Sequence, residues 1–100
     1  MDINFNYVHV TASDRLEGAT TQKLNQLKGR YDFIVGAQVY YKKENASNPE
    51  EGKIVEIELS IPGPRLFATA SQNNYDSSLQ SVIDDLKRQL EKRKGKMSVR

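Results

Sequence analysis

The amino-acid sequence predicts an α+β fold in which a four-stranded sheet carries two helices on one of its faces, in the order β-α-β-β-β-α. Four segments alternate between apolar and polar residues with the period of two that is typical of strands. Two others repeat apolar residues every three or four positions, as amphipathic helices do. At 100 residues the chain has room for one hydrophobic core. We therefore predict a single domain over residues 1–96, followed by a short basic tail at 97–100.

The first strand and the first helix come from the N-terminal third of the chain. The strand is predicted from Ile3, Phe5, Val8 and Val10. Its alternation shifts midway, which predicts a β-bulge at Asn6-Tyr7. Thr11 or Ser13 is expected to cap the helix, because a hydroxyl oxygen accepts a hydrogen bond from a free amide of the first turn. The core-facing stripe of this helix is Leu16, Ala19, Thr20, Leu24, Leu27 and Tyr31.

Three further strands are predicted between residues 33 and 70, separated by a polar loop at 44–52 and the turn-forming Pro62-Gly63-Pro64. The first runs from Phe33 to Lys43. The expected core positions are Val35, Ala37, Val39 and Tyr41, then Val55, Ile57, Leu59 and Ile61, and last Leu66, Ala68 and Ala70. The opposite face of the sheet is expected to carry Ile34, Tyr40, Ile54 and Phe67, partly covered or in contact with a partner. Base stacking on that face is disfavoured, because the element order and the glycine-aromatic signature of an RNA-recognition sheet are missing.

The last helix is expected to begin after Asn73, Asn74 or Asp76, which are all residue types that cap helices. Its apolar stripe is Leu79, Val82, Ile83, Leu86 and Leu90. At about 100° per residue, Arg88 and Lys92 fall nearly opposite this stripe. The sequence therefore predicts a long helix with one apolar face and one basic face.

Positive charge is concentrated in this last segment. Residues 87–100 contain seven basic residues and one acidic residue, a net charge of +6. The first 86 residues contain eight basic and twelve acidic residues, a net charge of −4. Such an uneven distribution indicates an anionic partner for one end of the molecule.

Pairing within the helix accounts for only part of this charge. Asp84 is expected to pair with Arg88, and Lys87 with Glu91, at i,i+4 spacing. A solvated, self-paired helix end is therefore one interpretation of the segment. The remaining cations have no acidic partner at helical spacing, which favours RNA phosphates as counter-ions. The candidate RNA-binding residues are Lys23, Lys28, Lys87, Arg88, Lys92, Arg93, Lys94 and Lys96.

Other kinds of site lack the residues that they need. The sequence has no cysteine, which excludes disulfides, thiolate metal sites and cysteine nucleophiles and agrees with a reducing compartment. His9 is the only histidine, and no nucleophile motif accompanies it. Glu56 and Glu58 are expected to be solvated strand charges rather than an acid–base pair. We expect no enzymatic activity, no metal, no cofactor and no small-molecule substrate.

The sequence also favours a cytoplasmic protein that makes no membrane contact. Its first residues lack the basic and apolar regions of a secretory signal. No apolar run approaches the roughly 20 residues that span a bilayer.

The segment from Leu86 to Lys94, L-K-R-Q-L-E-K-R-K, resembles the L-x-R-Q-L-x-K-x-K ending of the ribosome hibernation promoting factor family. This family includes the ribosome-associated inhibitor A and was formerly called sigma-54 modulation protein. The similarity extends over nearly the whole chain, because the predicted element order, the Leu66-x-Ala68-x-Ala70 strand and the long closing helix also match. With no linker or second domain before Arg100, we expect a short form.

The resemblance implies a double-stranded-RNA-binding-like fold that lodges in the small ribosomal subunit, between head and body, across the tRNA and mRNA sites. It implies that Lys23, Arg88, Lys92 and Lys94 contact ribosomal RNA. It further implies a translation inhibitor of stress or stationary phase that acts by steric occlusion.

Two stretches depart from the family pattern. The family usually has Asp-x-Tyr-x-Ala-Ile-Asp at the start of its last helix, where this chain has residues 73–80, N-N-Y-D-S-S-L-Q. The family's Asp-Lys-Leu is replaced by Asp84-Asp85-Leu86, so an acid stands in place of a cation. These changes affect the expected strength of binding more than the expected fold.

Two other functions fit parts of the sequence. One is a protein-interaction module that regulates an acidic protein partner. The other is a small hydrolase such as an acylphosphatase, which has a similar length. That hydrolase fold ends in a strand and needs an anion-binding arginine loop, whereas this chain is predicted to end in a helix.

Overall fold

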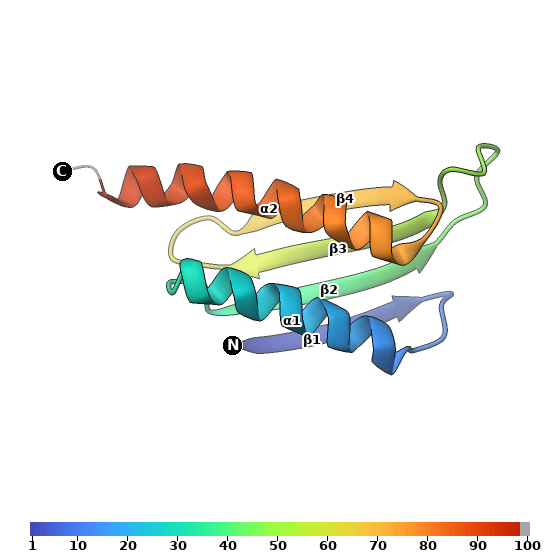
Figure 1. Cartoon of the computed structure of the whole chain (residues 1–100), viewed down its shortest axis with the longest axis horizontal. Coiled ribbons are helices and arrows are strands. Elements are labelled where there is room, and N and C mark those ends of the chain that lie inside the picture. The colour runs from blue at the N-terminus through green and yellow to red at the C-terminus, as the bar shows by residue number, and fades with distance from the viewer. Residues whose placement is uncertain (99–100) are drawn as a thin grey trace.

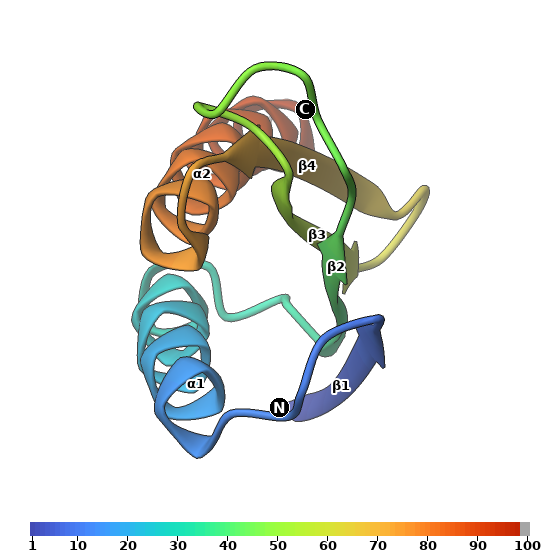
Figure 2. The same cartoon turned by 90° about the vertical axis from the view of Figure 1, so that its right-hand side faces the viewer.

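The computed structural model describes residues 1–98, and its elements follow the predicted order (Figure 1). They are β1 (Asp2–Val8), α1 (Asp14–Arg30), β2 (Gly36–Lys43), β3 (Lys53–Ser60), β4 (Leu66–Gln72) and α2 (Tyr75–Ser98). The strands form one sheet in the order β1-β2-β3-β4, with β1 parallel to β2 and the other neighbours antiparallel. Both helices cover the same face of the sheet (Figure 2). The predicted fold class is confirmed.

β1 differs from the prediction in its second half. Its pairing with β2 is continuous over all seven residues, so the predicted bulge at Asn6-Tyr7 is wrong. Tyr7 rather than Val8 continues the core-facing alternation, because its ring stacks on that of Tyr41 with 5.4 Å between the ring centroids. The strand ends before His9, whose φ of 60° lies in the left-handed region. Val10 packs against the core from beyond the strand.

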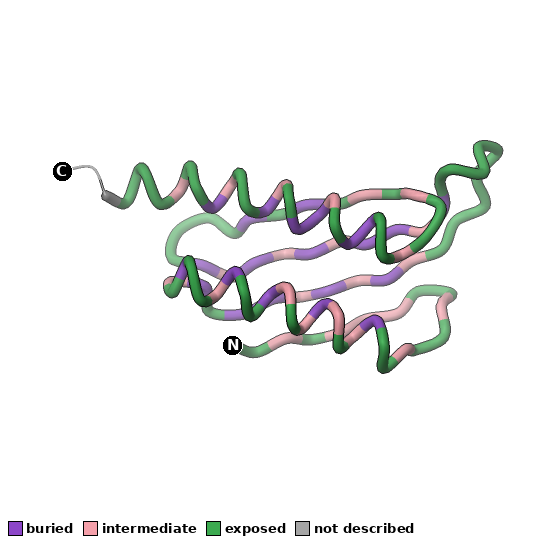
Figure 3. The backbone as a smooth tube through the Cα atoms, viewed as in Figure 1, coloured by how far each residue is buried: buried purple, intermediate pink, exposed green. Residues whose placement is uncertain are grey.

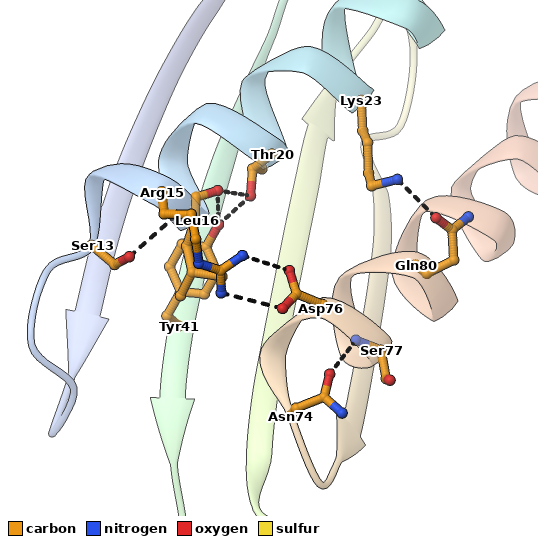
Figure 4. Close-up of polar contacts among 10 residues, drawn as sticks. All are labelled: Ser13, Arg15, Leu16, Thr20, Lys23, Tyr41, Asn74, Asp76, Ser77 and Gln80. Carbon is orange, nitrogen blue, oxygen red and sulfur yellow. Dashed lines mark hydrogen bonds and ion pairs between the residues drawn. The ribbon is translucent and has the colours of Figure 1, made fainter.

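α1 forms as predicted. Ser13 is its N-cap, and the Ser13 hydroxyl accepts a hydrogen bond from the Leu16 amide at 3.2 Å (Figure 4). Along the predicted stripe, Leu16, Thr20, Leu24, Leu27 and Tyr31 are buried and Ala19 is half-buried. The hydroxyl of Thr20 donates to the Leu16 carbonyl at 2.8 Å and contacts the Tyr41 hydroxyl. The hydroxyl of Thr20 is thus hydrogen-bonded inside the core.

β2 begins at Gly36 rather than at the predicted Phe33. Val35 is 61% exposed, so its predicted place in the core is wrong. Ile34 is only 1% exposed and packs in the core, which corrects its expected position on the opposite face. A glycine is needed at position 36, where β2 begins to pair with β1, because a Cβ there would lie 2.8 Å from the carbonyl oxygen of Asp2.

The core positions of the other strands are confirmed. Apart from Val35, the predicted core residues of the last three strands pack in the core. Ala70 is partly buried, and the buried residues are Ala37, Val39, Tyr41, Val55, Ile57, Leu59, Ile61, Leu66 and Ala68. On the opposite face, Ile54 is buried outside this core, Tyr40 is half-buried and Phe67 is 50% exposed. That face remains largely open.

α2 is anchored by its apolar stripe. The Asn74 side-chain oxygen accepts a hydrogen bond from the Ser77 amide at 2.8 Å, which caps the helix (Figure 4). The predicted residues Leu79, Val82, Ile83, Leu86 and Leu90 are all buried. The last turns extend past the end of the sheet and are mostly exposed (Figures 1 and 3). The helix includes Met97 and Ser98 of the predicted tail, and Val99 and Arg100 lie outside the described residues.

We predict that Leu90→Ala lowers the free energy of unfolding by about 2–5 kcal/mol, because Leu90 is fully buried and its loss leaves a cavity under α2. Urea denaturation measures the change. The volume-conserving Leu90→Met should cost less than about 1.5 kcal/mol. Equal losses in the two variants would contradict the packing described here.

Candidate nucleic-acid interface

The outer face of α2 presents Arg88 and Lys92 to solvent, in the directions that the sequence predicts. The Arg88 side chain is 72% exposed, and its ion pair within residues 1–98 is with Asp85 at 3.7 Å. The predicted pair between Asp84 and Arg88 is therefore wrong. The Asp84 carboxylate instead accepts a hydrogen bond from the side-chain amide of Gln80 at 2.9 Å. A long contact between exposed groups contributes little, so the Arg88 charge stays accessible to a partner.

A hollow of about 270 Å³ lies between α1 and α2 and contains three cations. Lys23, Arg30 and Lys87 supply the charge, and Gln80 forms part of the polar wall. The Lys23 ammonium donates to the Gln80 side-chain oxygen at 2.9 Å, so the two helices are joined across this hollow (Figure 4). The arrangement brings predicted residues from two distant parts of the sequence into one site.

A second hollow of about 360 Å³ continues toward the end of α1, where Arg30 and Lys94 are among its lining residues. Arg30 also lines the first hollow, so the two hollows adjoin at this residue, and we call them together the interhelical groove. Among the described residues, Asp32 is the one acidic residue that lines either hollow, so four cations face one acid there. The Tyr31 ring lies beside both cations. Its centroid is 5.6 Å from the Arg30 guanidinium carbon and 5.7 Å from the Lys94 nitrogen. These are cation–π distances.

Tyr31 also holds an acidic side chain of α2. Its hydroxyl donates a hydrogen bond to the Glu91 carboxylate at 2.5 Å, across the two helices. That bond is the main cause that raises the pKa of Tyr31 above its ordinary value, and burial adds to it. Within the described residues, Glu91 forms no ion pair with Lys87, so the predicted pair is wrong.

The other side of α2 carries Lys92, Arg93 and Lys96 around a smaller hollow of about 190 Å³. One guanidinium nitrogen of Arg93 donates to the carbonyl oxygens of Pro62 and Pro64, each at 3.1 Å. Arg93 therefore fastens the turn between β3 and β4 to the helix. Gly63 lies in this turn with a φ of +88°, a conformation that favours glycine.

Lys28 has a structural role of its own. Its ammonium donates to the carbonyl oxygens of Asp32 and Ile34 at 2.6 and 2.7 Å. It thereby satisfies acceptors in the connection that follows α1. Contact of Lys28 with RNA stays a prediction.

The carboxylates of the sheet do not neutralise the helix. Glu56 pairs with Lys42 and Glu58 pairs with Arg65, each at 2.9 Å. Both pairs lie on the open face of the sheet, away from the helices. Within residues 1–98, no ion pair joins a sheet carboxylate to a cation of α2. The excess positive charge predicted for this helix is therefore present in the fold.

No site for a metal is formed by the described residues. Residues 1–98 contain no group of three His, Cys, Asp or Glu side chains that could hold an ion. None of their helices is long and apolar enough to cross a membrane.

Comparison with known proteins agrees with the fold. The profile of the family described as Sigma 54 modulation protein / S30EA ribosomal protein matches residues 3–98. The chain belongs to this family. The resemblance predicted from the sequence is confirmed.

Relatives of this S30EA family member cover almost all of its length. A ribosome hibernation promoting factor of Acinetobacter guillouiae is 27% identical over 97 residues, which span 92% of this chain and 86% of that protein. A ribosomal subunit interface protein from Coxiella burnetii has a similar fold, with a TM-score of 0.80 and 24% identity over 95% of this chain and 99% of that one. The N-terminal domain of Thermus thermophilus Protein Y also has a similar fold, with a TM-score of 0.77 and 18% identity over 92% of this chain and 98% of that one.

The structure sorts the predicted residues of this S30EA family member into three groups. Lys23, Lys87 and Lys94 line the interhelical groove; Lys92, Arg93 and Lys96 line the hollow on the other side of α2, which Lys92 shares with the outer face; Arg88 lies on the outer face. Lys28, which bonds to the connection after α1, belongs to none of the three. Sequence reasoning missed Arg30, which lines both hollows of the groove. Its signal was available, because Arg30 stands seven residues after Lys23 and so falls on the same helix face.

We predict that Arg93→Ala lowers the free energy of unfolding by about 1 kcal/mol, because it removes the hydrogen bonds that hold the Pro62–Pro64 turn. Arg93→Lys keeps the charge without the fork of donors, and it should lose a similar amount. Urea denaturation of both variants is the measurement. Wild-type stability of the lysine variant would show that charge alone holds the turn.

Proposed function

We propose that this chain is a ribosome hibernation factor that binds ribosomal RNA of the small subunit through the basic face of α2. It blocks translation sterically at the tRNA and mRNA sites and catalyses no reaction. Membership of the S30EA family supports a ribosome-associated role in translation regulation. So do the names of its relatives, a ribosome hibernation promoting factor and a ribosomal subunit interface protein. The observation that carries the proposal is the excess of cations over acids in the second half of α2, where most of these side chains are exposed.

The physical argument begins with the spacing of the cations. Lys92, Arg93, Lys94 and Lys96 follow one another within little more than one helical turn, where like charges repel. The sheet carboxylates Glu56 and Glu58 are engaged elsewhere, with Lys42 and Arg65, and do not relieve this repulsion. RNA phosphates relieve it and release condensed counter-ions when they bind. Such contacts position a protein on folded RNA by shape and backbone rather than by base sequence.

The proposal treats residues 1–96 as one ribosome-binding domain and 97–100 as a basic tail. The described part of the chain is a long, narrow body of 49 × 25 × 19 Å, and α2 runs along it to one end (Figure 1). A rigid body of this length excludes other ligands from an RNA cleft simply by occupying it. The function needs no cofactor, small-molecule substrate or membrane, and its place is the cytoplasm, with the ribosomes, in stressed or stationary-phase cells.

We predict that the double substitution Arg88→Glu/Lys92→Glu abolishes co-sedimentation with small subunits, because it replaces two phosphate-facing cations with acids. Both side chains are exposed, so the circular dichroism spectrum and the urea midpoint should change little. Translation in a reconstituted system, which the wild type should inhibit, should proceed normally with this variant.

The matched control is Lys43→Glu/Lys53→Glu. It changes the net charge by the same amount at the opposite end of the molecule, where these two residues are paired across β2 and β3 (Figure 1). It should bind ribosomes nearly as well as the wild type. If the α2 variant sediments with small subunits as the wild type does, the basic-helix mechanism is wrong. Capture of an acidic protein after nuclease treatment, with no ribosomal RNA, would instead support an interaction module.

We also predict a steep dependence of binding on salt. The logarithm of the affinity should fall with the logarithm of the salt concentration by about 0.7–0.9 for each phosphate contacted. Four contacts would therefore give a slope of about −3. Sedimentation or filter binding between about 50 and 200 mM potassium chloride measures it. A slope near zero would contradict recognition through phosphates.

A further inference from the structure

Arg30 occupies the middle of the interhelical groove. It is the last residue of α1, and it lines both the hollow that contains Lys23 and Lys87 and the hollow that contains Lys94. The side chain is exposed and forms no ion pair among residues 1–98. The Arg30 guanidinium lies over the ring of Tyr31, with 5.6 Å between the guanidinium carbon and the ring centroid. A guanidinium that stacks on an aromatic ring keeps the hydrogen-bonding edge of its fork for a ligand.

Tyr31 is a firm support for this cation. The residue is only 3% exposed, and its ring meets that of Phe33 edge-on at 6.1 Å. Its hydroxyl is fixed by the bond to Glu91. A rotamer-rich side chain that rests on a fixed ring loses less freedom when a ligand binds. Tyr31 is thus a positioning residue for Arg30.

The hydrogen bond from Tyr31 also fixes the position of the Glu91 carboxylate. Glu91 stands four residues after Lys87, a spacing at which the two side chains would pair along the helix surface. The carboxylate accepts from Tyr31 instead. Lys87 therefore faces the groove without an ion pair in the described part of the chain.

The cations of the groove are spread along its length rather than gathered around one point. Lys23 and Lys87 lie toward one end, Arg30 in the middle and Lys94 toward the other. A compact anion would contact only part of this row. A chain of regularly spaced phosphates contacts all of it, and Arg is the side chain best suited to bind phosphate through two donors.

We propose that the interhelical groove binds a stretch of RNA phosphodiester backbone, with Arg30, supported by Tyr31, donating to a phosphate at its centre. This inference rests on the proposed function, and it names a contact that the basic outer face of α2 does not include. The Tyr31–Glu91 bond keeps Glu91 from neutralising the groove.

Arg30→Gln tests the phosphate contact in the full-length chain. It should weaken binding to small subunits about tenfold near physiological salt. It should also make the salt slope shallower by about 0.7–0.9, the share of one phosphate. Arg15→Gln removes the same charge from the other end of α1, where Arg15 pairs with Asp76, and it should leave both quantities unchanged. Arg30→Lys should restore the slope but only part of the affinity.

The outcomes separate this inference from the proposed function. If the wild type binds with a steep salt slope and Arg30→Gln behaves like it, the groove contact is wrong and the outer face of α2 carries the binding. A tenfold loss with an unchanged slope would also overturn the phosphate contact. If the wild type does not bind small subunits at all, the proposed function itself fails.

The positioning role has its own test, because a merely structural role would not show rescue. Tyr31→Phe releases Glu91 to pair with Lys87 and should weaken binding about twofold. Tyr31→Phe/Glu91→Gln removes that competing charge and should restore or exceed wild-type affinity. Failure of the second substitution to rescue the first would overturn the role of the Tyr31–Glu91 bond. Thermal unfolding of both variants confirms that the comparison is between folded proteins.

Discussion

Burial of one apolar stripe of α2 against the sheet determines where every cation of the helix points. The five residues of this stripe, from Leu79 to Leu90, are at most 4% exposed. Burying a leucine, isoleucine or valine side chain contributes about 1.5–3 kcal/mol, whereas an exposed ion pair contributes about 1 kcal/mol or less. The apolar contacts therefore fix the rotation of the helix about its axis. The cations take the directions that remain, toward solvent, toward α1 and toward the β3–β4 turn.

Three carboxylates, those of Glu56, Glu58 and Glu91, have partners other than the cations of α2. Glu56 and Glu58 form ion pairs on the open face of the sheet, and Glu91 is bound by a tyrosine hydroxyl. A hydrogen bond to a neutral donor satisfies a carboxylate without using a cation. The net charge of the whole chain is only +2, so the basic surface depends on the concentration of cations in residues 87–100 and on a fold that keeps most carboxylates away from them.

Period and capping predicted most of the fold, and the errors have physical causes. The bulge at Asn6-Tyr7 was expected because Val8 and Val10 alternate out of register with Ile3 and Phe5, which leaves Tyr7 out of the core. A tyrosine buries its ring and still satisfies its hydroxyl, and Tyr7 does so through Glu17 at 2.5 Å. The start of β2 was placed too early because Val35 continues the alternation of Ala37 and Val39. The close approach of the Asp2 carbonyl to Gly36 is a tertiary contact, which no local pattern contains.

The site was less predictable than the fold for the same reason. Spacing along α2 predicted two ion pairs, yet Asp84 and Glu91 are held by Gln80 and Tyr31 instead. The second of these partners lies 60 residues away in the sequence. The position of Arg30 in the groove was predictable from its distance to Lys23, but its support by the Tyr31 ring depends on how α1 and α2 pack together. Helical spacing therefore shows which faces are basic, and only the packing of the helices shows which of those charges are already used.

Asp84 and Asp85 act on different surfaces, and Asp85 is the one that replaces a cation of the family pattern. Asp85 lies 3.7 Å from Arg88 and lowers the local charge of the outer face of α2. Asp84 is tied to Gln80, which in turn accepts from Lys23 at the edge of the interhelical groove. The acids thus weaken the outer face directly but reach the groove only through a neutral amide. Because screening by water is weaker in a hollow between two helices than on the exposed outer face of α2, a cation that lines the groove attracts an anion more strongly than one on that outer face.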